Sequence, residues 1–345
     1  MVDVPGIDAS AVSEWLEVTV TGAQGPFHFE RIAGGHSNLT YRVESATSAP
    51  MVLRRPPLGH VLASAHDMGR EHRIISGLAR SDVPVPPALG FCEDADVNGA
   101  PFYVMAYVDG YVVRSDEIAA AVLVPAARTE VSRTLVDTLA AIHSVDLDAT
   151  GLSGLARHDG YIARQLKRWY GQWNQQKTRE LSGVDRVHEA LSELTPDQQE
   201  VTIVHGDYRL DNCIVGNDGK VRAVLDWEIC TLGDPLADLG MLMVYWTGPD
   251  DETSAWPGGR ATTLEGFWNR DRIAARYADV SGRDLVALDF YVSFAFWKLA
   301  CILEGVYSRY LGGALGDRDR SELEPFARQV EAAARAAEQR LELVR

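Results

Sequence analysis

The sequence lacks the usual marks of a secreted, zinc-binding or membrane protein. It has four cysteines in 345 residues, at positions 92, 213, 230 and 301, with no C-x-x-C pair. Zinc sites need closely spaced Cys and His ligands, which these cysteines lack, so we expect buried thiols in a reducing compartment. No run approaches the ~18 uninterrupted apolar residues of a transmembrane helix, and residues 1–10 show no basic stretch followed by an apolar core. We predict a cytoplasmic protein with no membrane association.

Positive charge is also scarce. The chain has 33 Lys and Arg against 49 Asp and Glu, which gives a formal net charge of −16. Such a surface repels polyanions at long range, so we do not expect a nucleic acid partner. Solubility is the simplest reason for the acidic surface, and a cationic substrate is the alternative.

The sequence does show a change near residue 110, from residue patterns typical of strands to patterns typical of helices. Before it, short stretches rich in β-branched and aromatic residues predict an antiparallel sheet, interrupted by one helix from Ser64 to Arg80 that Ser64 would cap. Gly34-Gly35 and Asn98-Gly99 are candidate hairpin turns. The predicted strands are F-H-F-E-R-I, L-T-Y-R-V-E, M-V-L-R-R, A-L-G-F-C-E and P-F-Y-V-M-A-Y-V.

After residue 110 the apolar spacing becomes helical, with one β insertion at 201–226. We therefore predict an α+β protein with a small N-terminal lobe and a larger, mostly helical C-terminal lobe. The expected divisions are an N-terminal extension at 1–25, an N-lobe at 26–108 and a C-lobe at 109–345. Further helices are predicted at 161–180, 236–246, 264–277, 285–307 and 321–343.

The β insertion combines the residue types that phosphoryl transfer needs. V-T-I-V at 201–204 predicts a strand that ends in a polar loop, so Asp207 emerges at a strand end. The turn Asn217-Asp218-Gly219-Lys220 closes a hairpin that brings Asn212 and Asp226 nearly opposite each other. Mg²⁺ prefers oxygen ligands and leaves most positions to phosphates and water, which Asn212 and Asp226 suit. Asp207 would accept the proton of an attacking hydroxyl, although a lone Asp in a turn is usually a structural cap.

The same segment resembles a known family. H-G-D-Y-R-L-D-N, followed by V-L-D-W-E-I-C-T-L-G-D-P-L-A-D-L-G, is similar to the signature of the aminoglycoside phosphotransferase and choline kinase family. It looks most like the bacterial branch related to the kinase-like domain fused to some acyl-CoA dehydrogenases. The resemblance covers roughly residues 25 to 310 and implies a protein-kinase-like fold and ATP-dependent phosphorylation of an alcohol. Asp226-Trp227-Glu228 stands where protein kinases have D-F-G, and no A-P-E follows, so protein substrates are not expected.

The resemblance also implies a nucleotide site in the N-lobe. A loop at Gly34-Gly35-His36-Ser37-Asn38 would cover the phosphates, although a plain tight turn explains it as well. Arg54 stands where the family usually has Lys, with Glu71 as its partner, and a purely structural pair is the alternative. The last strand of the sheet would line the adenine pocket. The nucleotide-binding residues implied are Gly35, Ser37, Asn38, Arg54, Glu71, Met105, Tyr107 and Val108.

Two further residues are expected to support the catalytic loop. Asp234 would cap the helix that begins at Pro235 and steady the loop, as its family position suggests. His205 would hold the loop through hydrogen bonds rather than transfer protons.

The acceptor is the least constrained part of the prediction. A hydroxy acid or hydroxyacyl-CoA is our first expectation, favoured by the family branch and by the basic residues Lys167, Arg168, Lys177 and Arg179, although a solvated helix face explains these four residues as well. An aminoglycoside or a choline-like amine is the alternative, for which the tryptophans of the C-lobe could supply a cage. Because Arg54 replaces Lys, a non-catalytic nucleotide- or acyl-CoA-binding regulator is the rival from another class. The sequence leaves monomer and homodimer equally open.

Overall fold

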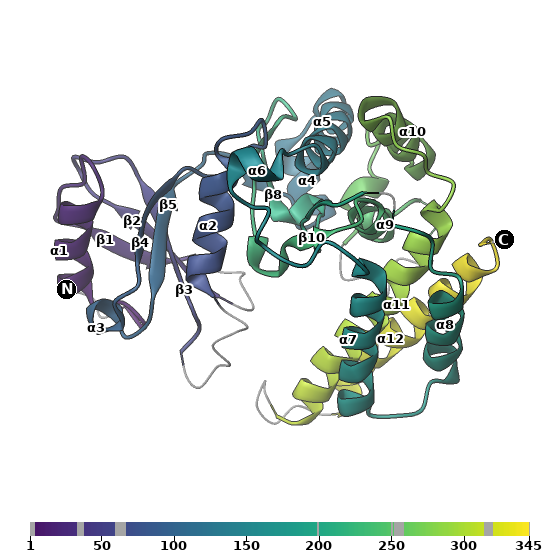
Figure 1. Ribbon diagram of the computed structural model, residues 1–345. Helices are drawn as coiled ribbons and strands as arrows, with labels where there is room; N and C mark the ends of the chain where they lie inside the picture. Colours follow the sequence, from purple (N-terminus) through teal and green to yellow (C-terminus); the bar gives the residue numbers. More distant parts are fainter. Residues whose placement is uncertain are drawn as a thin grey trace. The chain divides into compact units, whose positions relative to one another are not determined.

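A computed structural model describes residues 4–32, 38–58, 67–198, 200–249, 251, 259–313 and 320–344. The chain divides into two compact units (Figure 1), which we describe separately. The first consists of Met1–Gly110, Asp148–Leu152 and Arg222–Ile229. The second consists of Tyr111–Leu147, Ser153–Val221 and Cys230–Arg345. Residues 222–229, which include Asp226, thus pack with the first unit although they follow the catalytic loop in sequence.

The first unit contains a five-stranded antiparallel sheet in the order β1-β2-β3-β5-β4. Tyr41, Leu53 and Val104 lie opposite one another on neighbouring strands, so their side chains share one face. Arg54 and Tyr103 are the next pair along and therefore point to the other face. All five predicted strands are confirmed: β1 His28–Arg31, β2 Leu39–Glu44, β3 Met51–Arg55, β4 Ala88–Cys92 and β5 Phe102–Ala106.

Helix α1, Ala9–Thr19, covers the apolar face of this sheet, as Figure 1 shows. Asp8 caps it by accepting hydrogen bonds from the backbone N–H groups of Ser10 and Ala11. Val12 and Leu16 are fully buried in the same core as the sheet residues. The N-terminal segment is therefore an integral part of the first unit.

Helix α2, Met68–Leu78, begins later than the sequence predicts. Its N-cap is Asp67, which accepts from the N–H of Arg70, whereas the predicted cap Ser64 lies outside the described residues. The helix places Glu71 against the face of the sheet that carries Arg54. Asn98-Gly99 lies in the connection between the antiparallel strands β4 and β5, as predicted, but this connection is longer than a tight turn, because Ala95–Asn98 form the short helix α3, which Gly99 ends in the left-handed conformation with φ 72°.

The second unit is mostly helical, and most of its predicted helices are confirmed. The predicted start at Leu264 was wrong, because α10 begins at Arg270 behind the N-cap Asn269. Helix α8 was not predicted at all. The long helices are α5 Pro125–His143, α7 Tyr161–Gln176, α8 Ser182–Glu193, α9 Leu236–Tyr245, α10 Arg270–Ser281, α11 Leu288–Leu311 and α12 Arg320–Leu341, with α4 Asp116–Val122 and α6 Leu147–Thr150 shorter.

Short strands frame the catalytic loop. Strand β7, Thr202–Val204, pairs antiparallel with β10, Thr231–Gly233, and β6, Tyr111–Val112, pairs with β8, Cys213–Val215. After β8 the chain makes the predicted turn, in which the N–H of Gly216 bonds to the carbonyl of Lys220 at 2.9 Å. Strand β9, Val221–Val224, follows this turn.

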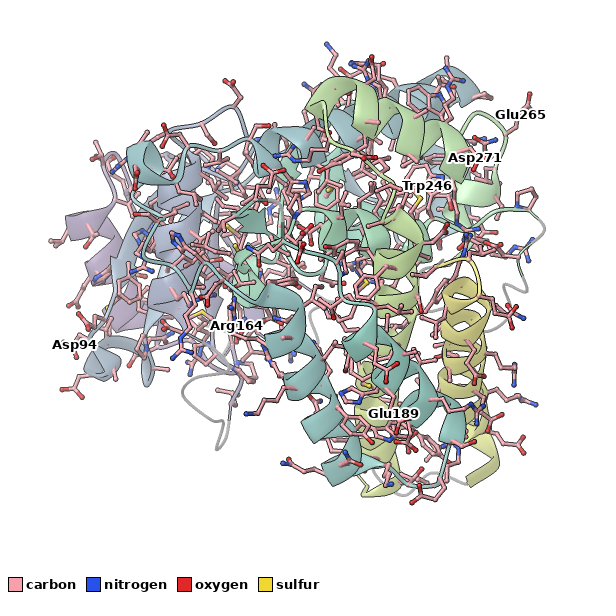
Figure 2. All side chains as sticks on the ribbon, turned by 45° about the vertical axis from the view of Figure 1, so that its right-hand side comes forward. Asp94, Arg164, Glu189, Trp246, Glu265 and Asp271 are labelled. Atoms are coloured by element: carbon pink, nitrogen blue, oxygen red, sulfur yellow. The ribbon has the colours of Figure 1, made fainter. Side chains whose placement is uncertain are left out.

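Helix α11, with 24 residues, is the longest helix in the described part of the chain. It is long and apolar enough to span a bilayer, but 83% of its apolar window is buried inside the protein. It packs against α12, α9 and α7, so it is the core helix of the second unit. Charged residues such as Asp94 and Glu265 are exposed instead, and Figure 2 shows their side chains pointing away from the ribbon. The four cysteines are all free and buried, as predicted.

Candidate active site

The loop predicted to be catalytic, residues 205–212, begins where β7 ends and closes in a 3₁₀ turn at Leu210–Asn212. The amide nitrogen of Asn212 donates to the backbone carbonyl of Asp207 at 2.8 Å and to its Oδ2 at 2.9 Å. Arg209 Nε donates to the same Oδ2 at 3.2 Å. Within the described part of the chain, no hydrogen bond is made by Oδ1 of Asp207, whose side chain is 26% exposed. Oδ2 of Asp207 is thus held by hydrogen bonds, and Oδ1 is available to accept another.

Asp238 on α9 holds the loop from behind. Its two carboxylate oxygens accept the backbone N–H groups of His205 at 2.6 Å and of Gly206 at 2.8 Å. Burial raises the pKa of Asp238, but hydrogen bonds from His143 and Gly206 outweigh it and hold the pKa below its usual value. The prediction for Asp234 therefore holds for the helix and is wrong for the loop. Asp234 accepts from the N–H of Leu236 at 3.0 Å and caps α9, whereas Asp238 steadies the loop.

His205 contributes a hydrogen bond within the loop, as expected. Its Nδ1 accepts the backbone N–H of Asp207 at 3.3 Å. The ring is fully buried and lies edge-on to Tyr208 at 5.9 Å. It therefore shapes the loop from the protein interior.

His143 on α5 completes the buried network. Burial lowers the pKa of the imidazole, and the neighbouring Asp238 carboxylate opposes this only in part. Its Nδ1 lies 2.7 Å from the hydroxyl of Tyr277, and its Nε2 lies 3.3 Å from Oδ2 of Asp238. A neutral ring fits both contacts if the Tyr277 hydroxyl donates to Nδ1 and Nε2–H donates to Asp238.

This buried histidine predicts acid sensitivity. Because its pKa in the folded protein is lowered, the unfolded chain binds the proton first, and stability falls as pH drops below about 6.5. The slope from one such group reaches about 1.4 kcal/mol per pH unit. His143→Gln should flatten the dependence of the urea midpoint on pH between pH 7.5 and 5.5, relative to the exposed-site control His158→Gln. Equal slopes in the two variants would contradict this assignment, since His72 and His188 contribute equally to both.

A second charged cluster lies in the first unit, around Arg54. Its Nη1 is 3.2 Å from Glu71 Oε1, and its Nη2 is 2.6 Å from Asp226 Oδ1 and 3.7 Å from Glu228 Oε2. Burial lowers the pKa of Arg54, but the carboxylates, Glu71 first, raise it above its ordinary value, so the guanidinium stays charged. Asp226 has φ 65°, which is uncommon for a residue with a side chain and frequent at functional sites.

The nucleotide-binding residues implied by the family are only partly within the described chain. Gly35 and Ser37 lie outside the described residues. Asn38 is buried, and its amide nitrogen donates to Glu228 Oε2 at 2.9 Å. The end of the expected phosphate loop is thereby tied to the segment that carries Asp226.

Two backbone N–H groups at the end of the expected adenine-binding strand are already bonded to other backbone carbonyls. The N–H of Ala106 bonds to the carbonyl of Pro87 at 2.8 Å, and that of Tyr107 to the carbonyl of Pro50 at 3.1 Å. Among the described residues the N–H of Val108 has no backbone partner. The Met105 side chain is 8% exposed and belongs mainly to the core. Tyr107 packs its ring under Arg42, 4.6 Å from the guanidinium carbon.

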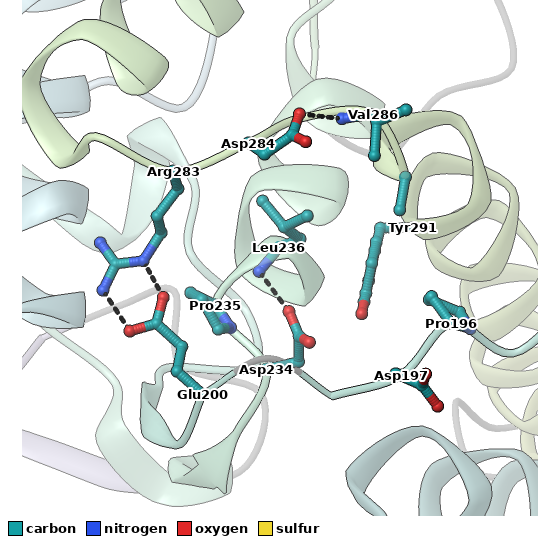
Figure 3. A pocket seen from close by; sticks show the side chains of 11 residues that line it. Pro196, Asp197, Glu200, Asp234, Pro235, Leu236, Arg283, Asp284, Val286 and Tyr291 are labelled. Atoms are coloured by element: carbon teal, nitrogen blue, oxygen red, sulfur yellow. Dashed lines mark hydrogen bonds and ion pairs between the residues drawn. The ribbon is translucent and has the colours of Figure 1, made fainter.

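A small pocket lies beside Asp234, as Figure 3 shows. Its volume is about 30 Å³, which holds roughly one water molecule. An ion pair between Arg283 and Glu200 forms one side, and Tyr291 and Asp284 form another. The pocket is too small for a nucleotide or an acceptor, so we assign it to the packing around α9.

Sequence reasoning overlooked two residues of the catalytic loop's environment. Arg209 contacts the Asp207 carboxylate, bonds to Asp211 at 3.1 Å and lies 4.7 Å above the ring of Tyr245. Lys298 of α11 donates to the carbonyl of Gly206 at 2.8 Å. The signal for Lys298 was present, because it is a single cation in the apolar run F-A-F-W-K-L-A-C.

Comparison with known proteins places the chain in a family. Residues 28–276 match the phosphotransferase enzyme family. The chain is 36% identical over 320 residues to mouse acyl-CoA dehydrogenase family member 10, a match that covers 89% of the chain and 29% of that protein. It therefore spans less than a third of this relative's length.

Solved structures agree on the fold. A Ralstonia eutropha protein provisionally designated an aminoglycoside phosphotransferase superposes with a TM-score of 0.81 and 29% identity, over 97% of this chain and 98% of the other. A spectinomycin phosphotransferase with bound ADP and spectinomycin gives a TM-score of 0.61 and 16% identity, over 97% and 100% of the two chains. The predicted protein-kinase-like α+β fold is confirmed. This chain belongs to the phosphotransferase enzyme family.

Proposed function

We propose that this enzyme uses ATP and Mg²⁺ to phosphorylate the hydroxyl group of a small hydroxy acid or hydroxyacyl-CoA, with Asp207 as the catalytic base. The observation that carries the proposal is the asymmetry of the Asp207 carboxylate. Oδ2 is fixed by Asn212 and Arg209, and Oδ1 has no hydrogen bond among the described residues. A carboxylate oriented in this way can accept the proton of an attacking hydroxyl at Oδ1 while directing the hydroxyl oxygen toward the phosphoryl group.

Asn212 and Asp226 are our proposed metal ligands. The amide nitrogen of Asn212 is occupied by Asp207, which leaves its oxygen as the atom for a cation. Asp226 keeps Oδ2 beside the oxygen that Arg54 contacts. Amide and carboxylate oxygens are the donors that Mg²⁺ prefers, and the ion would neutralise charge on the nucleotide phosphates. In the described chain no three His, Cys, Asp or Glu residues are placed to hold a metal.

The nucleotide would be held by the first unit. Arg54 is charged and buried, and its Nε makes no hydrogen bond among the described residues, so the guanidinium can still donate to a phosphate oxygen. The N–H of Val108 is the backbone group we assign to the adenine edge, with Gly35, Ser37 and Asn38 near the phosphates. Glu71 orients Arg54 through their ion pair. Retention of ADP by the related spectinomycin phosphotransferase supports an adenine nucleotide.

The surroundings of the second unit favour an anionic over a cationic acceptor. The tryptophans considered for an aromatic cage are almost entirely buried where the structure describes them, so they serve the core. Lys177 and Arg179 pair with Glu180 and Glu304. Lys167 and Arg168 remain exposed on α7 and suit an anionic acceptor. Kinship to acyl-CoA dehydrogenase family member 10 supports an acyl thioester. A cytoplasmic location belongs to the same proposal.

The proposal is tested with the purified chain, ATP and Mg²⁺, using β-hydroxybutyrate, β-hydroxybutyryl-CoA, choline and kanamycin as acceptors. We expect ADP formation and a phosphorylated product, identified by mass spectrometry, with the hydroxyacyl compounds, and loss of both with EDTA. CoA compounds should also raise the melting temperature by binding the folded state preferentially.

Other outcomes separate the alternatives. Product from kanamycin or choline alone would replace the acceptor we propose. ADP formation no greater than that of Asp207→Asn with every acceptor would favour a non-catalytic nucleotide- or acyl-CoA-binding regulator. Activity that persists in EDTA would remove Mg²⁺ from the proposal.

A further inference from the structure

The catalytic loop has a second buried charge behind it, on α11. Lys298 is 4% exposed, and its Nζ donates to the backbone carbonyl of Gly206 at 2.8 Å. The two residues are 92 positions apart in sequence. The neighbouring residues of α11 are apolar and buried, so Lys298 is a cation inside the core helix of the second unit.

Lys298 and Asp238 hold Gly206 from opposite sides. The N–H of Gly206 donates to Asp238 Oδ1 at 2.8 Å, and its carbonyl accepts from Lys298. Gly206 has φ 88°, a conformation that other residues rarely adopt. The peptide between Gly206 and Asp207 is also fixed at its other end, since the N–H of Asp207 bonds to His205. Three side chains from separate segments thus set the direction in which Asp207 leaves the backbone.

The surroundings of Lys298 offset the cost of burying its charge only in part. Burial lowers its pKa, the carboxylates of Asp207 and Asp238 act against this, and Arg168 adds to it. The ammonium lies 5.6 Å from the centre of the Trp169 ring, within the range of a cation–π interaction. A Met or Leu would fill this position without desolvating an ion, so packing alone gives no reason for a lysine.

We propose that Lys298 is a positioning residue for the phosphoryl transfer. It holds the Gly206 carbonyl and thereby orients the Asp207 carboxylate toward the acceptor hydroxyl. The inference rests on the proposed function in one respect, the role of Asp207 as base. Lys298 itself does not touch a reacting atom.

The test compares Lys298→Met, which keeps an unbranched side chain one atom shorter and without the donor, with Lys298→Arg, which keeps a charged donor. Cys301→Ala is the matched control, because Cys301 is equally buried three residues along α11. ADP formation is measured with ATP–Mg²⁺ alone and with β-hydroxybutyryl-CoA. Displacement of a catalytic group by about 1 Å lowers rates by about 10²-fold. We expect kcat of Lys298→Met to fall by about that factor, with an unchanged KM for ATP and a substantial recovery in Lys298→Arg.

The results distinguish this inference from the proposed function. If Asp207→Asn abolishes turnover while Lys298→Met keeps the kcat of the parent enzyme, the inference is overturned and the function stands. If Cys301→Ala loses as much kcat as Lys298→Met, the role of Lys298 is structural only. Should the Met variant fail to fold, Lys298→Gln replaces it. Its side chain is one atom too short to reach Gly206, so an unchanged kcat there overturns the inference equally.

Discussion

Asp207→Asn is expected to lower kcat by a factor of about 10²–10⁴, the usual contribution of a general base. The amide keeps the size of the carboxylate, so packing of the loop changes little. Its oxygen can accept from Asn212 and Arg209 in place of Oδ2, which puts the NH₂ group where Oδ1 stood, and an amide nitrogen cannot accept the hydroxyl proton. Steady-state kinetics with ATP varied should show the loss in kcat, with KM for ATP nearly unchanged, because Asp207 has no assigned role in nucleotide binding.

Asp211→Asn is the matched control for this measurement. Asp211 lies in the same loop, and its carboxylate is also bound by Arg209, at 3.1 Å. Since it contacts neither Asn212 nor Gly206 through a described hydrogen bond, its loss should leave kcat largely intact. An equal loss in both variants would show that the loop depends on charge in general, and Asp207 would no longer be distinguished as the base.

Asp238→Ala should have the largest effect on stability. It leaves the N–H groups of His205 and Gly206 buried without acceptors, and removes the partner of His143. An unsatisfied buried donor costs about 1–3 kcal/mol, so we expect the free energy of unfolding to fall by about 3–5 kcal/mol. Urea denaturation measures this change, and kcat should fall as well because Gly206 is no longer held.

Asp234→Ala provides the comparison. It removes a helix cap, which is worth about 0.5–2 kcal/mol, and leaves the backbone of the loop bound to Asp238. A larger loss in the Asp234 variant than in the Asp238 variant would restore the role that the sequence suggested for Asp234.

Local features of this protein could be predicted from sequence because local chemistry determines them. The alternation in β2 and the aromatic residues of β5 predicted the sheet. The ordered set Asp207, Asn212 and Asp226 could be read as a phosphotransferase signature because its spacing is short. The predicted start of α2 was wrong because Asp67 and Ser64 are both good N-caps, and helix propensity does not choose between them.

Contacts between distant segments could not be predicted in the same way. Asp234 and Asp238 both follow the loop, and only the packing of α9 decides which carboxylate meets the N–H groups of residues 205 and 206. The bond from Lys298 to Gly206 joins residues 92 positions apart and depends on where α11 crosses the unit. The pairing of Arg54 with Glu71 was predicted, whereas its shorter contact with Asp226 was not.

The position of α11 limits where the chain can be cut to make a shorter recombinant fragment. The family match ends at residue 276, and α11 begins at Leu288. A recombinant fragment trimmed to the matched region would retain Asp207, Asn212 and Asp226. It would also leave α9 without the helix that covers it and the Gly206 carbonyl without its donor. A fragment meant to keep these contacts therefore extends at least to the end of α11 at Leu311, and a boundary drawn by sequence similarity would separate the proposed site residues from their support.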